Sequence, residues 1–272
     1  MYREIWNNNY RNVCSIDLMG STNSIIIGVT DFRVGESIMT DDLIYSDNDA
    51  KKVRITFYEQ DGFTPRLIKY YEIEEFKDIL PAKKNFDRLG FSLFAFENET
   101  GDSGLKLCNA CGPSIGMDAV TISYQSEYNN ISLKPAVISS FYKNNSGLTY
   151  IQYDGSVKLG STGGPLIDVK SGKVIGIVAN KELKVMKIYK KLIKILDSNI
   201  ESLQKVEGNW NVNDIDPIQV LIANQHMIKH ISREFISNSS TRVGVALDIG
   251  HLIETMESNL DFQFDKKDRG HY

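Results

Sequence analysis

The stretch IQYDGSVKLGSTGGPL, residues 151–166, decides the fold of this chain. Its second half packs three glycines and a proline into residues 160–165. Glycine adopts backbone angles that are closed to other residues, so this run predicts a tight, preset loop. Successive backbone N–H groups in such a loop can converge on an anion, which peptide hydrolysis needs where charge develops on the scissile oxygen. Thr162 adds a hydroxyl as a candidate nucleophile, although a plain hairpin turn between two strands would use the same residues.

The stretch resembles the nucleophile loop of trypsin-like serine proteases, in particular that of the Deg/HtrA branch. That branch has Ile-Gln-Thr-Asp, five further residues, and then Gly-Asn-Ser-Gly-Gly-Pro-Leu. The residues that match at the same spacing are Ile151, Gln152, Asp154, Gly160, Gly163, Gly164, Pro165 and Leu166. The resemblance continues in the strands expected at residues 173–178 and 241–249. It implies an oxyanion loop made by Gly160, Ser161 and Thr162, with Thr162 in place of the catalytic serine.

The rest of the chain predicts a mainly β fold. Short apolar runs recur between clusters of Gly, Asn, Asp and Ser, which is typical of a barrel or sandwich. These runs are residues 13–19, 24–29, 53–58, 91–96, 119–124 and 136–141. With the resemblance, they predict a double β-barrel of the chymotrypsin type. The pattern then changes to helical spacing at residues 181–206, and Asp216 before Pro217 marks the start of a second helix, so we expect an α-helical hairpin inserted in the second barrel.

These patterns also predict where each part begins and ends. We expect the first β-barrel at residues 10–126. The second β-barrel should comprise residues 127–180 and 241–260, ending in a terminal helix. Residues 181–240 should form the helical insertion, and the charged residues 261–272 a flexible tail.

The resemblance implies a catalytic triad of serine, histidine and an acid. Besides the serine position, the histidine and acid positions also differ in this chain. The family's histidine ends a strand of the type Thr-x-x-His, whereas this chain has Leu43 after Thr40. All four histidines lie after the loop: His226, His230, His251 and His271. The acid position falls on Gly90, or on Asp87 in another register. A threonine hydroxyl without a neighbouring base is a weak nucleophile, so we expect Thr162 to be inactive.

Other groups of charged or metal-binding side chains have both a possible functional role and a plain structural explanation. Lys184, Lys187, Lys191 and Lys194 share one arc of the first inserted helix, which suits an acidic partner or phosphates, or simply a solvated face. Cys108 and Cys111 have the Cys-x-x-Cys spacing of half a zinc site or of a redox pair, but no second pair completes a zinc site, so we interpret them as ordinary thiols. His226 and His230 stand one helical turn apart with no third ligand in view. We expect no metal and no cofactor.

Composition limits the function. The chain has 272 residues, 42% of them hydrophobic, and a net charge of −4, which gives no overall attraction to nucleic acid. Three cysteines cannot form a disulfide framework and no secretory h-region opens the chain, so we expect a cytoplasmic protein without a membrane span.

We therefore expect a trypsin-like serine protease homologue without a working triad, a pseudoprotease that binds another protein or a peptide. One alternative is an unusual peptidase that uses Thr162 with a lysine or Asp42 as base. Another is an adaptor that binds nucleic acid or an acidic partner through the lysine-rich helix.

Overall fold

The structure is a computed structural model, and it describes residues 1–20, 23–41, 50–80, 90–96, 103–109, 112–179, 184–209, 216–238 and 241–258. The chain divides into two compact units. The first comprises residues 1–180 and 241–272, and the second comprises residues 181–240.

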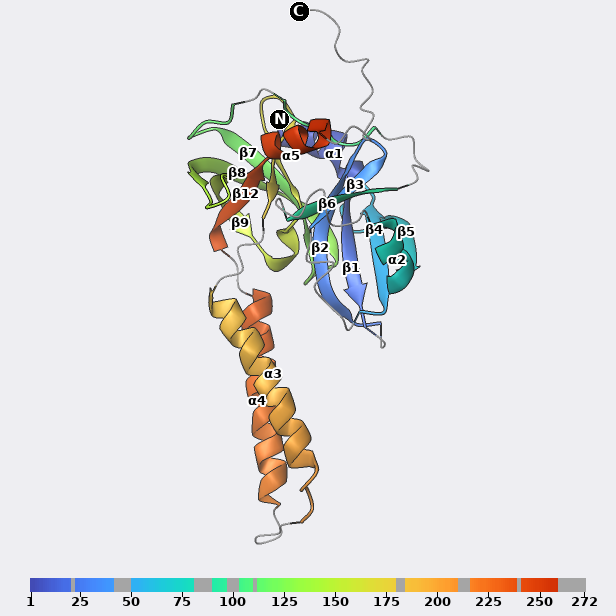
Figure 1. The fold of residues 1–272 in the computed structure, drawn as a ribbon, viewed down its shortest axis with the longest axis vertical. Coiled ribbons are helices and arrows are strands. Elements are labelled where there is room, and N and C mark those ends of the chain that lie inside the picture. Colours follow the sequence, from blue (N-terminus) through green and yellow to red (C-terminus); the bar gives the residue numbers. More distant parts are fainter. Residues whose placement is uncertain are drawn as a thin grey trace, which may run out of the picture. The chain divides into compact units, whose positions relative to one another are not determined.

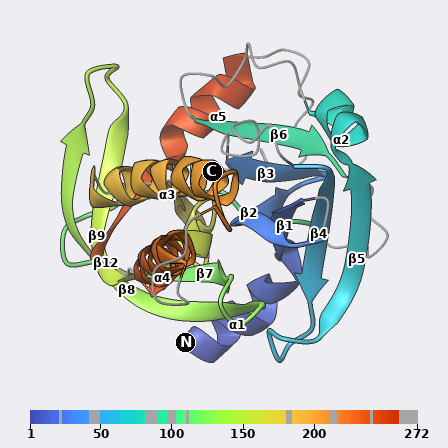
Figure 2. The ribbon, with the colours of Figure 1, turned by 90° about the horizontal axis from the view of Figure 1, so that it is seen from below.

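The N-terminal half of the first unit is a six-stranded antiparallel sheet in the order β5-β4-β1-β2-β3-β6 (Figures 1 and 2). Its strands are β1 (Val13–Met19), β2 (Ile25–Val34), β3 (Ser37–Asp41), β4 (Lys52–Tyr58), β5 (Pro65–Glu72) and β6 (Phe91–Ala95). The sequence predicted a barrel here. Among the described residues, no pairing joins the edge strands β5 and β6, so this half is a curved sheet around its own apolar cluster.

The C-terminal half is a closed barrel in the order β10-β11-β12-β9-β8-β7. Its strands are β7 (Asp118–Gln125), β8 (Asn130–Lys143), β9 (Thr149–Val157), β10 (Pro165–Asp168), β11 (Val174–Val178) and β12 (Thr241–Asp248). Strand β7 belongs to this barrel, whereas the sequence patterns predicted a boundary after residue 126. Pairing of β7 with both β8 and β10 fixes its place, and the second of these partners is distant in sequence.

Three helices accompany the strands of this unit: α1 (Tyr2–Asn9), α2 (Ile73–Ile79) and α5 (Ile249–Ser258). Only α5, the terminal helix, was expected. Helix α2 begins with a capping box, in which Glu72 and Glu75 exchange backbone and side-chain hydrogen bonds, and this is the local signal that could have predicted it.

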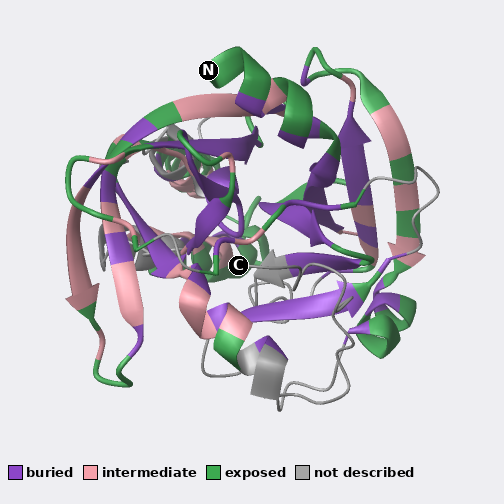
Figure 3. Ribbon diagram, turned by 90° about the horizontal axis from the view of Figure 1, so that it is seen from above, coloured by how far each residue is buried: buried purple, intermediate pink, exposed green. Residues whose placement is uncertain are grey.

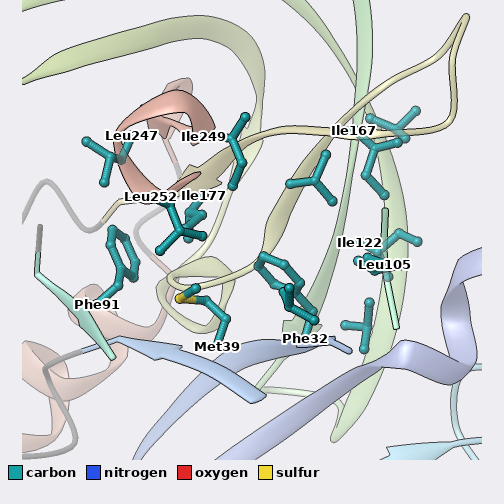
Figure 4. Packing of buried hydrophobic residues seen from close by; sticks show 14 of the residues in the cluster. Phe32, Met39, Phe91, Leu105, Ile122, Ile167, Ile177, Leu247, Ile249 and Leu252 are labelled. Atoms are coloured by element: carbon teal, nitrogen blue, oxygen red, sulfur yellow. The ribbon is translucent and has the colours of Figure 1, made fainter. Parts of the chain in front are cut away.

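The sheet and the barrel share one apolar core. Figure 4 shows Phe32, Met39 and Phe91 of the sheet packed near Ile177 and Leu252, from the barrel and α5. Figure 3 shows the same buried layer between the two sets of strands. Each such side chain contributes roughly 1.5–3 kcal/mol by leaving water, so the core fixes how the two halves meet.

The second unit is the helical hairpin of α3 (Lys184–Gln204) and α4 (Pro217–Asn238), which lie side by side (Figure 1). Asp216 Oδ1 accepts the N–H of Ile218 at 2.8 Å and so caps α4, as its position before Pro217 predicted. No helix in the described ranges is long and apolar enough to cross a membrane.

Candidate functional site

The glycine-rich loop lies between β9 and β10 and is held by both halves of the first unit. Thr30 of β2 donates its backbone N–H to Thr162 O at 2.9 Å and its hydroxyl to Gly160 O at 2.5 Å. The same hydroxyl accepts the N–H of Tyr124, on β7, at 2.8 Å. From β11, Val178 O accepts the N–H of Gly163 at 2.8 Å. The loop is therefore fixed by the sheet and the barrel together.

Two glycines in this loop are required by close backbone contacts. Gly163 has φ +83°, and a Cβ there would lie 2.2 Å from Thr30 O. A Cβ on Gly160 would lie 2.7 Å from Tyr124 O. Any side chain at either position would push the loop away from β2 or β7, so these glycines are needed for the packing of the two halves.

The oxyanion loop differs in one donor from the prediction. Residues Leu159–Ser161 form a 3-10 turn, in which the N–H of Ser161 donates to Lys158 O at 2.9 Å. That amide is occupied, so it does not converge on an anion with its neighbours. The prediction that Ser161 contributes a donor is wrong for this reason, and Gly160 and Thr162 remain the two candidate donors.

The Thr162 side chain is buried, with 4% of the residue exposed. In the part of the chain that the structure describes, its hydroxyl has no hydrogen bond to a basic side chain. A general base must come within hydrogen-bond reach of the proton it removes. No described residue meets this requirement at Thr162.

The predicted acid position, Gly90, lies at the start of a strand. Strand β3 pairs with β6 so that Asp41 lies opposite Phe91, and Gly90 stands immediately before β6. Gly90 has φ +76°, and as a glycine it carries no side chain that could orient a base. Leu43, Asp42 and Asp87, the other residues considered for base and acid, lie outside the described residues.

The histidines that the structure describes lie on helices α4 and α5. His251 is on α5, where its Nε2 accepts the N–H of Thr149 at 2.7 Å. This bond commits Nε2 to a structural role. His226 and His230 are on α4, in the second unit. His271 lies outside the described residues.

A buried charge close to the loop was not predicted from the sequence. Asp31 directly follows Thr30 on β2 and is buried; Arg33, two residues further along the strand, is also buried and lies over the rings of Phe57 and Phe96. The Asp31 carboxylate lies 3.7 Å from where a Cβ of Gly163 would be. The thiol of Cys14 lies in the same region; burial and then the Asp31 charge raise its pKa well above the ordinary value, so it stays protonated. Charged residues within an otherwise apolar strand are the sequence feature that could have indicated a buried charge here.

A second buried charge group lies where β1 meets β4. Arg54 donates from Nη2 to Asp17 Oδ2 at 2.8 Å and from Nε at 3.1 Å, and the Asp17 side chain is fully buried. Burial raises the pKa of Asp17 although Arg54 opposes this shift. Burial also raises the pKa of Tyr58 to about 12, so this phenol, which is hydrogen-bonded to Ser15, stays neutral.

A chain of polar side chains connects Lys134 with the loop. Lys134 Nζ donates to Gln125 Oε1 at 2.9 Å, and Gln125 Nε2 donates to Ser123 Oγ at 3.2 Å. The Ser123 and Ser161 hydroxyls are also 3.2 Å apart. Burial, and then the nearby charge of Lys158, lower the pKa of Lys134 to about 8. Lys134 is therefore partly neutral under mildly alkaline conditions, and the sequence pattern gave no sign of this.

The remaining predicted sites are dispersed. Of the four lysines assigned to a partner surface, all on α3, Lys191 and Lys194 are exposed; the side chains of Lys184 and Lys187 lie outside what the structure describes. Cys108 is disulfide-bonded, which contradicts its interpretation as an ordinary thiol. Its neighbour Cys111 lies outside the described residues.

No metal or compartment follows from these residues. Within the described ranges, no three His, Cys, Asp or Glu side chains are grouped to hold a metal ion. Disulfides persist mainly in oxidising compartments, so the disulfide at Cys108 does not support a cytoplasmic location, which stays a prediction.

Comparison with known proteins agrees with this architecture. The profile of a trypsin-like peptidase domain matches residues 37–177. The structure of the HtrA-type protease AlgW with a tripeptide superposes with a TM-score of 0.56 and 14% identity, covering 96% of this chain and 64% of that one. The active form of the Rv3671c protease from M. tuberculosis gives a TM-score of 0.53 and 14% identity, covering 96% and 86%.

These likenesses establish the fold. The molecule has the chymotrypsin-type double β architecture with an inserted helical hairpin, and it spans 64% of the length of the AlgW chain it matches. Among curated proteins, none matches this sequence.

Proposed function

This chain belongs to the trypsin-like peptidase family, and we propose that it uses the family's scaffold to bind a protein or peptide without cleaving it. The observation that carries the proposal is the environment of Thr162. Its hydroxyl lacks a hydrogen-bonded base among the described residues. A threonine hydroxyl needs such a base to attack a carbonyl at neutral pH.

The acid position supports the same conclusion. Gly90 offers no side chain at the start of β6, and the sequence places Leu43 where the family has histidine. Without base, acid and serine, such a site retains at most the effect of substrate binding and the oxyanion donors, roughly 10³–10⁴-fold over water. Binding is the function that remains available to such a site.

The loop itself supports binding. Hydrogen bonds from β2, β7 and β11 hold it in place, so its backbone does not have to become ordered when a peptide binds. The Gly160 and Thr162 amides are the donors that a peptide carbonyl would meet. A preorganised site loses less free energy on binding than one that must first become ordered.

A peptide-library experiment tests both parts of this proposal. The full chain and its Thr162→Ala variant are incubated with peptides from a digested proteome, and new termini are identified by mass spectrometry. We expect neither protein to create new termini and both to retain a subset of peptides with a shared sequence motif. Cleavage that disappears in Thr162→Ala would contradict the pseudoprotease part of the proposal.

The binding part has its own control pair. Gly160→Ala, whose Cβ would lie 2.7 Å from Tyr124 O, should release the retained peptides. Gly172→Ala, where a Cβ meets no atom within 4 Å, should retain them. If no motif is enriched, or if both variants behave alike, the loop is not the binding site.

The pKa of Lys134 supports a second candidate, an unusual peptidase. A neutral lysine can act as a base, and Lys134 lies near the loop, since hydrogen bonds join it through Gln125 and Ser123 to Ser161. The Gln125 amide cannot pass a proton on, so Lys134 would have to leave Gln125 and reach the Thr162 hydroxyl directly. This candidate predicts fluorophosphonate labelling of the loop that increases as the pH rises through about 8. Lys134→Met should abolish the labelling, and its absence in the parent protein would exclude the candidate.

A further inference from the structure

Two rows of residues, here called stripes, run along helix α4 on different sides. The more apolar stripe points away from α3. The stripe packed toward α3 is largely polar at its C-terminal end and consists of Ile218, Ile222, Gln225, Lys229 and Ser232. Within it, Lys229 forms an ion pair with Asp197. The outward stripe consists of Val220, Leu221, Met227, Ile228 and Ile231, which are 48%, 46%, 62%, 44% and 60% exposed. At 3.6 residues per turn, its centre lies about 120° around the helix from the first stripe.

Helix α3 repeats this arrangement. Leu196 and Ile200, 4% and 6% exposed, face the hairpin's interior. A second set follows 3-4 spacing. It begins with the half-buried Leu192 and continues with the exposed residues Ile195, Asn199, Ser202 and Val206. Ile195 in this set is 57% exposed, and Val206, just beyond the helix, is 41% exposed.

Both outward sets follow the heptad pattern of helices that pack against other helices. On α4, Leu221, Asn224, Ile228 and Ile231 are spaced by three, four and three residues. Apolar residues at this alternating spacing form the seam of a coiled coil, and one polar residue in a seam fixes its register. Each helix of the hairpin has such polar residues in this set, Asn199 and Ser202 in the last turns of α3 and Asn224 in the first half of α4.

Charge is separated along the hairpin. Near the start of α3 and the end of α4, five lysines and Arg233 outnumber Glu234; the lysines are Lys184, Lys187, Lys190, Lys191 and Lys194. At the opposite end, Glu201, Glu207 and Asp216 outnumber Lys205. The basic end of one hairpin therefore complements the acidic end of another that runs in the opposite direction.

We propose that the outward stripes of α3 and α4 form the interface between two copies of this chain, packed hairpin against hairpin in antiparallel orientation. In this arrangement, the apolar residues near one hairpin's basic end meet those near its partner's acidic end. Two helices of 21 and 22 residues side by side offer a face of roughly 30 by 20 Å per copy. The total of roughly 1,200 Å² is at the lower limit of specific interfaces. The proposal is independent of whether Thr162 can hydrolyse a peptide.

Sedimentation equilibrium of the full chain, up to about 100 µM, tests the proposal, because a specific dimer of this size should associate in the micromolar range. The test variant is Ile228→Glu with Ile231→Glu. The matched control, Gln219→Glu with His226→Glu, adds the same two acidic residues to exposed polar positions of the same helix. We expect the parent and the control to dimerise and the test variant to be monomeric with at least roughly 100-fold weaker association, since buried unpaired charges are costly. Equal far-UV circular dichroism shows that the helices are intact.

A charge exchange tests the orientation. Glu201→Lys with Glu207→Lys should weaken the dimer, as should Lys191→Glu with Lys194→Glu. The four substitutions together should restore it, because the reversed ends again complement each other. A monomeric parent, including one that binds only a different protein, would overturn the proposal, as would dimerisation that survives Ile228→Glu with Ile231→Glu. Failure of the fourfold variant to recover would overturn the antiparallel orientation.

Discussion

The hydroxyl of Thr30 donates a 2.5 Å hydrogen bond to the carbonyl of Gly160, so a strand of the N-terminal sheet holds the glycine-rich loop of the C-terminal barrel. The same oxygen accepts the backbone N–H of Tyr124. One buried hydroxyl thus satisfies two backbone groups from different parts of the barrel. The position of the loop depends on how the two halves meet, and it does not depend on a working triad.

Thr30→Val should destabilise the protein clearly more than Thr30→Ser. Valine keeps the shape but leaves the Gly160 carbonyl and the Tyr124 N–H without their partner, at a cost of roughly 1–3 kcal/mol for each buried group. Serine retains the hydroxyl and loses only a methyl group. Urea unfolding of the three proteins measures the difference, and equal stability of the two variants would show that the hydroxyl contributes little.

Gly163→Ala should be among the most destabilising single changes in the loop. Its Cβ would lie 2.2 Å from Thr30 O, in addition to the strain of φ +83°. Gly172→Ala is the matched control, since φ there is +68° and a Cβ meets nothing within 4 Å. The control should cost about 1 kcal/mol, the strain alone, and the loop variant several times more. Thermal unfolding would refute the close contact if the two variants lose the same stability.

Asp17→Asn should change the pH dependence of stability in a defined direction. Burial raises the pKa of Asp17 above its ordinary value of 3.8, so the folded protein holds this proton more tightly than the unfolded chain does. Its contribution to stability is therefore present at low pH and falls as the pH rises from that value through the raised pKa. The stability of the parent relative to Asp17→Asn should decrease across this window in urea titrations.

Asp61→Asn is the control with the opposite sign. Hydrogen bonds from the Thr64 hydroxyl, and then from the backbone N–H groups of Thr64 and Phe63, lower the pKa of Asp61. The stability of the parent relative to this variant should therefore increase as the pH rises through the acid range. A parent advantage over Asp17→Asn that also increases with pH would mean that Arg54 outweighs burial at Asp17.

Restoring the triad residues tests the predicted catalytic positions. Leu43→His, Gly90→Asp and Thr162→Ser together should produce slow hydrolysis of a fluorogenic peptide, whereas Thr162→Ser alone should not, because a serine also needs a base. Activity of Leu43→His with Thr162→Ser, without the Gly90 substitution, would assign the acid to Asp87 instead. Hydrolysis by Thr162→Ser alone would show that a base is already present.

Removal of residues 181–240, with the ends joined by a Gly-Ser linker of about eight residues that can span roughly 25 Å, should leave the first unit folded. The hairpin is a separate compact unit, and β12 keeps its pairing with β9 and β11 on its own. We expect a cooperative unfolding transition and complete loss of dimerisation. An unfolded or still dimeric product would contradict the separation of the two roles.

Much of this protein follows from short-range features of its sequence. Glycines and a proline within six residues can only form a tight loop, and the structure needs Gly160 and Gly163 where β2 and β7 approach. The strand at residues 13–19 and the start of α4 at Pro217 were predicted correctly, since strand periodicity and helix capping involve neighbours a few residues apart. The family follows from the same loop.

Only the tertiary structure decided the rest, because it depends on contacts between distant residues. Strand β7 joins the second barrel through its pairing with β10, which no local pattern encodes. The occupied amide of Ser161, the lowered pKa of Lys134 and the burial of Asp17 all depend on what surrounds each group after folding. The sequence determined which strands, turns and helices form locally. The pKa values at the site and the exposed face of α4 were decided by how these elements pack, since burial sets both the desolvation of a charged group and the exposure of an apolar one.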